Sequence, residues 1–148
     1  MKKSEIKPAL EALKEIKVHK FEDKEIRNLI IGDHFALLDV SRKLDAKIED
    51  MRKVFLESYK DEEQIVQDLQ TQIGEASTRA EQIELSQKLR QEHKGYLDAV
   101  KAFNEQVAEL YSEEFEIKPV DREKLMNELI KLDLKLSWVE ALYPLFNL

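Results

Sequence analysis

Apolar residues recur at alternating spacings of three and four through the central part of the chain, the period of a helix with one apolar stripe. The first such run covers about residues 22–73, and the second ends near residue 113. In the first run the stripe holds Leu37, Leu44, Met51 and Ile65 at one heptad position and Ile48, Phe55 and Leu69 at the other. The pattern predicts two long helices with coiled-coil seams.

A short connector, residues 74–78, separates these two predicted helices. Gly74 can end the first helix, and Ser77 or Thr78 can cap the second. Because the connector is so short, the two helices must pack as antiparallel neighbours. We therefore expect a long hairpin in which the two apolar seams face each other.

Folding the chain at this connector also sets a register between the two helices. Phe55 is expected beside Leu97 or Val100, and His93 near Glu62. A His–carboxylate pair could be pH-sensitive or catalytic, whereas a polar layer in a coiled coil fixes the register. Two helices alone cannot exclude water from a site, so we favour the register-setting role for His93.

Shorter helical patterns lie at both ends of the chain. Ser4 is expected to cap a helix over about residues 4–16, Asp121 a helix that follows it, and Ser137 a last helix beginning at Trp138. Residues 17–21 and 115–117 have an extended pattern that allows a minimal two-stranded contact.

The start of the first long helix, about residues 22–35, extends beyond the part that the second can cover, so it needs the terminal helices as partners. We expect an all-α protein, a long antiparallel two-helix coiled-coil hairpin with a small helical head formed by the N- and C-terminal helices. The whole chain, 1–148, is interpreted as a single helical domain with a head over 1–36 and 114–148 and a stalk hairpin over 37–113. Aromatic residues expected in the head are Phe21, Phe35, Trp138, Tyr143 and Phe146.

Composition narrows the classes of protein to consider. Glycine and proline occur three times each, so elements must be few and long, and the net charge of −7 comes with interspersed signs. An acidic chain without clustered cations argues against nucleic acid as a partner. With no signal peptide, no membrane-spanning run and no cysteine, the expected location is cytoplasmic, without membrane association.

No constellation of residues with a known chemistry stands out. The three histidines lie outside the spacings of metal-binding motifs, and no glycine-rich phosphate loop or nucleophile elbow is present. Neighbouring carboxylates such as Glu62 and Glu63 point in different directions on a helix. We therefore expect no catalytic residue, no cofactor and no metal, and no enzymatic activity.

The C-terminal segment is rich in apolar groups for the end of a chain. It can seal the core of the head, or part of it can dock on a partner or a second copy of the chain. The candidate partner-binding residues are Trp138, Leu142, Tyr143, Leu145 and Phe146.

The function favoured by these features is that of a non-enzymatic helical interaction or assembly protein, a scaffold or adaptor that binds an unidentified protein through its stalk or head. Association of two stalks into a four-helix bundle would bury more apolar surface, which favours a homodimer. The alternative is an acidic inhibitor that imitates nucleic acid and occupies the basic groove of another protein, for which one face would have to be continuously negative.

Overall fold

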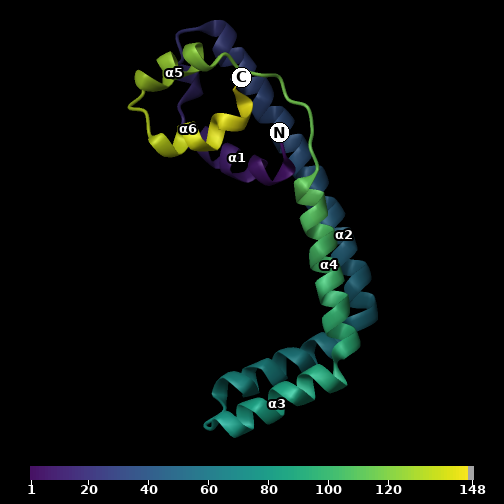
Figure 1. Cartoon of the computed structure of the whole chain (residues 1–148). Coiled ribbons are helices and arrows are strands. Elements are labelled where there is room, and N and C mark those ends of the chain that lie inside the picture. Colours follow the sequence, from purple (N-terminus) through teal and green to yellow (C-terminus); the bar gives the residue numbers. More distant parts are fainter. Residues whose placement is uncertain (147–148) are drawn as a thin grey trace. The chain divides into compact units, whose positions relative to one another are not determined.

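The computed structural model describes residues 1–146, and within this range it contains six α-helices and no β-strand. The helices are α1 (Ile6–Glu15), α2 (Lys24–Glu75), α3 (Arg79–Glu92), α4 (Lys94–Ser112), α5 (Arg122–Ile130) and α6 (Leu136–Leu142) (Figure 1). Short 3-10 turns cover Lys3–Glu5, Val18–Lys20 and Tyr143–Leu145. The all-α prediction with a long helical hairpin is confirmed.

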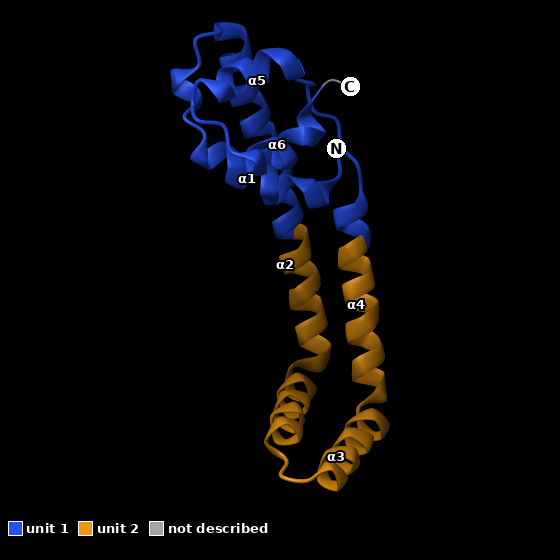
Figure 2. Ribbon diagram, turned by 60° about the vertical axis from the view of Figure 1, so that its left-hand side comes forward, with its two compact units in different colours: residues 1–46, 109–148 blue, residues 47–108 orange. Residues whose placement is uncertain are grey.

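The chain divides into two compact units, which Figure 2 shows in different colours. Unit 1 comprises residues 1–46 and 109–148, and unit 2 comprises residues 47–108. Helices α2 and α4 each contribute to both units. Unit 1 therefore includes more of the two long helices than the head range of 1–36 and 114–148 interpreted from the sequence.

The core of unit 1 is one apolar cluster to which α1, the beginning of α2, α5, α6 and the C-terminal turn all contribute. Figure 1 shows these helices gathered around the first turns of α2. Helix α1 contributes Ile6, Ala9, Leu10 and Leu13, whose spacings of three and four place them on one face. Trp138 is buried in the same cluster as Ile26 and Ile30 of α2, and α6 packs on α1, as predicted.

All five aromatic residues expected in the head belong to unit 1, but two of them are exposed. Phe35 and Tyr143 keep 69% and 52% of their surface accessible. Phe35 is exposed because of its angular position around the axis of α2. Ile30, Asp33 and Leu37, which recur at three and four residues, are the buried positions, and Phe35 lies on the opposite face of the helix.

The predicted helix caps were partly right. Asp121 caps α5 through its Oδ1 atom, which accepts from the Lys124 backbone N–H at 3.0 Å, and Thr78 caps α3 by accepting from the Glu81 N–H at 3.2 Å. Ser4 and Ser137 are not caps. Both lie inside helical turns, because the chain enters its first turn at Lys3 and α6 at Leu136.

The extended segments pair differently from the prediction. Residues 17–21 contain a 3-10 turn, so the expected two-stranded contact with residues 115–117 is wrong. Single β-bridges instead join Lys2 to Glu114 and Val120 to Phe146. The N–H of Phe115 donates to the Met1 carbonyl at 3.0 Å, so the first residues of the chain occupy this edge.

Unit 2 is a helical hairpin whose connector lies after α2, where the sequence predicts it. The Phe55 ring contacts the rings of Tyr96 and Phe103, with centroids 6.0 and 5.4 Å away. Leu97 and Val100 lie within this span of α4, so the structure agrees with the predicted register to within one heptad.

The second leg of the hairpin is two helices, whereas the sequence pattern predicts one. His93 ends α3 with non-helical backbone angles, φ −120° and ψ 24°, and α4 begins at the next residue. Gly95, a poor helix former, follows at once and weakens the helix at this point. In Figure 2 both legs of the hairpin turn near this junction.

Candidate functional site

Four of the five candidate partner-binding residues lie in the core of unit 1. Trp138, Leu142, Leu145 and Phe146 are at most 6% exposed, and only Tyr143 presents its side chain to solvent. The indole Nε1 of Trp138 donates a hydrogen bond of 3.0 Å to the Glu15 carboxylate. The described part of the C-terminal segment therefore contributes to the core of unit 1.

The backbone also holds this segment in place. The N–H of Val120 donates to the Leu145 carbonyl at 2.8 Å, next to the bridge between Val120 and Phe146. Val120 is itself fully buried. The segment before α5 and the end of the chain are thus paired through both backbone and side chains.

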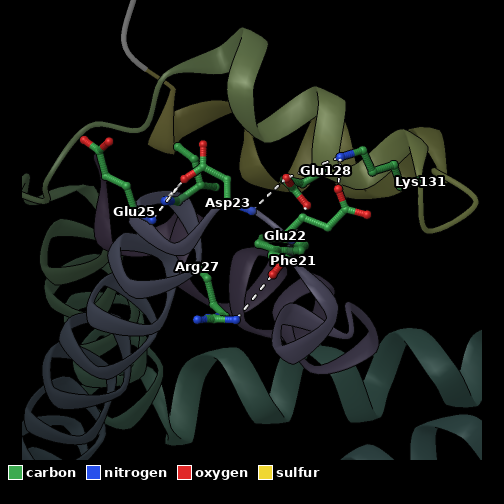
Figure 3. A network of polar contacts seen from close by, with 8 residues as sticks. Phe21, Glu22, Asp23, Glu25, Arg27, Glu128 and Lys131 are labelled. Atoms are coloured by element: carbon green, nitrogen blue, oxygen red, sulfur yellow. Dashed lines mark hydrogen bonds and ion pairs between the residues drawn. The ribbon is translucent and has the colours of Figure 1, made fainter.

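A buried carboxylate from α5 caps the beginning of α2 (Figure 3). Glu128 is 4% exposed, and its two oxygens accept from the backbone N–H groups of Glu22 at 2.9 Å and Asp23 at 3.2 Å. The Asp23 side chain accepts in turn from the N–H groups of Glu25 and Ile26. Two carboxylates thus accept from four backbone N–H groups around the beginning of α2 and oppose the positive end of the α2 dipole.

A lysine completes this network. Lys131 forms ion pairs with Glu22 at 2.8 Å and with Glu128 at 3.8 Å. The hydrogen bond from Lys131 lowers the pKa of the exposed Glu22 carboxyl. The sequence reading missed Glu128, although it lies three residues after the buried Leu125 and hence on the same face of α5. The network joins α5 to the beginning of α2.

Asp33 is a second buried carboxylate. It is 2% exposed, and its Oδ2 atom has no hydrogen-bond partner among residues 1–146. Burial raises the pKa of Asp33 to about 6, while the positive charge of Lys118 acts in the opposite direction. The sequence analysis missed this residue as well, because an aspartate on a long charged helix is usually expected to be solvated.

The predicted neighbourhood of His93 is confirmed. Its Nδ1 atom lies 3.0 Å from Oε1 of Glu62, and its side chain is 13% exposed. Beside this pair the rings of Tyr59 and Tyr96 meet edge to face at 5.8 Å. Burial raises the pKa of Tyr96, and the nearby carboxylates of Glu63 and Glu62 add to the effect.

Within residues 1–146 the His93 ring forms one side-chain hydrogen bond, to Glu62. A hydrogen bond between the two legs suits the role of fixing their register.

Metal chemistry and membrane insertion find no support in the described part of the chain. No group of three or more histidine, aspartate or glutamate side chains there is arranged to hold a metal ion. None of the helices described is long and apolar enough to cross a membrane.

The fold and these contacts define an all-α protein built from a helical hairpin and a helical core closed by both chain ends. Comparison with models of known protein families, with curated proteins and with solved structures finds no match.

Proposed function

We propose that the protein is a non-enzymatic interaction or assembly protein that associates with itself through its hairpin. The observation that supports this proposal is the small amount of apolar surface that unit 2 buries. In residues 47–108 only Val66, Leu69 and Tyr96 are buried, and α3 buries no residue at all.

Large apolar side chains remain exposed on the same unit. Val54 and Ile65 are 65% and 51% exposed, and a separation of eleven residues places them on one face of α2. Full burial of an aliphatic side chain contributes about 1.5–3 kcal/mol relative to leaving it in water. Packing of two hairpins into a four-helix bundle would cover these residues and complete the half-buried seams.

Charge makes the self-association dependent on salt. Residues 47–108 contain thirteen acidic and nine basic residues, so two copies of the hairpin repel each other at long range. Screening at high ionic strength weakens this repulsion. We therefore expect the dimer to become more stable as salt concentration rises, the opposite of an association driven by opposite charges.

Sedimentation equilibrium of the full chain at several concentrations and two ionic strengths tests the proposal. The double variant V54E/I65E should be monomeric, because each glutamate would be buried in the bundle, and should keep its helical circular dichroism spectrum. Gln67→Glu adds a negative charge at another exposed position of α2 and serves as the control, which should still dimerise. A full chain that stays monomeric at every concentration would contradict self-association.

A further inference from the structure

A groove of about 450 Å³ lies on unit 1 between α1 and the part of α2 that belongs to this unit, and the end of α4 closes one side. Its floor is apolar and includes Leu10 and Leu44, both buried, together with the half-buried Leu38 and the partly exposed Tyr111. The candidate residues at the C-terminus take no part in it.

Basic side chains dominate the polar lining of this groove. Four of them, Lys3, Lys7, Lys14 and Arg42, outnumber the two acidic ones, Glu11 and Asp45. This balance contrasts with the net charge of −7 of the whole chain. Residues 1–20, which supply one wall, contain six lysines and three glutamates.

Most of these cations are available to a ligand. Lys3 is engaged in an ion pair with Glu113. Lys7, Lys14 and Arg42 are exposed and form no ion pair within residues 1–146. This groove thus combines an apolar floor with exposed cations that form no ion pair within residues 1–146.

The spacing of the cations indicates the shape of the ligand. Lys7 and Lys14 are seven residues apart on α1, so they lie on one face, roughly 10 Å apart along the helix axis. Carboxylates seven residues apart on a second helix have the same separation. A partner helix bound between α1 and α2 would place its apolar side chains on the floor of the groove. The acidic residues along one edge of that helix would then face Lys7 and Lys14, and those along the other edge would face Arg42.

We propose that this groove binds an acidic amphipathic helix of another protein. This proposal rests on the proposed function, since it names the chemistry of one partner of an interaction protein. It uses a surface on unit 1, however, and self-association through the hairpin does not need that surface. A nucleic acid fits less well, because its phosphate backbone would leave the apolar floor uncovered.

A synthetic peptide provides the probe. The peptide is a fluorescein-labelled amphipathic helix of about 18 residues, with leucines along one face and glutamates along both edges of that face. A second peptide carries lysine in place of every glutamate. Fluorescence anisotropy titrations with the full chain should show binding of the acidic peptide, weaker at high salt, and no saturable binding of the basic one.

Charge reversal in the groove identifies the site. The variant K7E/K14E should lower the affinity for the acidic peptide more than tenfold, because two favourable ion pairs become repulsive. The variant K88E/K101E makes the same change in net charge on exposed positions of unit 2 and should bind like the unchanged protein. Both variants should keep the helical circular dichroism spectrum.

Three outcomes would overturn the proposal. The first is that K7E/K14E and the unchanged protein bind the acidic peptide with equal affinity, and the second is that the acidic and basic peptides bind equally well. The third is that K7E/K14E converts a dimer to a monomer in the absence of peptide. The last result would assign the groove to a second copy of the chain. The V54E/I65E variant separates the two proposals, because it should lose self-association and still bind the acidic peptide.

Discussion

Asp33 is the residue at which burial and charge conflict most directly. Its carboxyl lies on the face of α2 that also buries Ile30 and Leu37, with one oxygen unpartnered among the described residues. Because the folded-state pKa of about 6 lies above the ordinary aspartate value of 3.8, the folded protein holds this proton more tightly than the unfolded chain does. The free energy of unfolding should therefore decrease as pH rises from about 4 through 6, by up to about 3 kcal/mol.

Replacement of Asp33 by asparagine removes the titrating charge at nearly constant volume. We expect D33N to lose most of the decrease in stability between pH 4 and pH 7, and to be more stable than the unchanged protein at pH 7.5 by about 1–3 kcal/mol. Urea unfolding followed by fluorescence of Trp138, the single tryptophan and a buried one, measures this.

The matched control is Asp39→Asn, which alters an exposed aspartate of α2 paired with Lys43. It should change stability by less than about 0.5 kcal/mol and leave the pH profile as it is. If D33N and the unchanged protein share one pH profile, Asp33 is neutralised by a contact that operates in solution and the argument from its burial fails.

At the scale of residues, residue type decided which positions of the sequence were interpreted as core or surface. Asp33 and Glu128 both lie on core-facing stripes, and periodicity alone would have counted them there. They were missed because a carboxylate is usually solvated, and because the backbone donors that Glu128 satisfies come from residues far away in the chain. A pattern along one helix carries no information about such a partner.

At the scale of elements, the hairpin was predictable because everything that defines it is local. The apolar seams of the two predicted helices match once the chain is folded at the connector. This match predicted the position of the connector with its Thr78 cap and the pairing of His93 with Glu62. The break between α3 and α4 was not predictable in this way. Leu89 and Tyr96 are one heptad apart on either side of His93, so the apolar pattern stays in phase across a residue that is not helical.

Replacement of His93 by leucine tests its role in the register of the hairpin. The hydrogen bond to Glu62 is partly exposed, and a leucine would add apolar contact at the seam, so we expect thermal stability to be kept or raised. The distribution of distances between spin labels on the two legs should broaden, because the polar contact that distinguishes one register from its neighbours is gone.

Glu62→Gln is the companion variant, since it keeps a hydrogen-bonding group next to the ring and should preserve the narrow distance distribution. A loss of several kcal/mol in H93L would mean that the imidazole makes specific buried bonds, and the register-setting interpretation would then be wrong.

At the scale of the whole molecule, the two units differ in how their contacts are distributed along the chain. Unit 2 is one continuous segment folded back on itself, whereas unit 1 is assembled from both ends of the chain. Met1 meets Phe115, Glu15 meets Trp138, and Glu22 meets Glu128. The identity of the β-bridges depends on these contacts between distant residues, which is why periodicity predicted the hairpin in more detail than the core.

Removal of the last residues tests whether the C-terminal segment closes unit 1. A chain ending at Leu136 lacks Trp138, Leu142, Leu145 and Phe146, all at most 6% exposed, and also the backbone partner of Val120. Loss of a buried tryptophan alone costs about 3–5 kcal/mol, a large share of the stability of a small domain. We expect the truncated chain to lose much of its helical circular dichroism, to bind a dye for exposed apolar surface and to aggregate.

Tyr143→Ser, which alters the exposed aromatic of the same segment, should leave the fold intact. A truncated chain that stays folded and monomeric but no longer associates would instead make the segment a docking element, because its burial would then contribute nothing that unit 1 needs to fold.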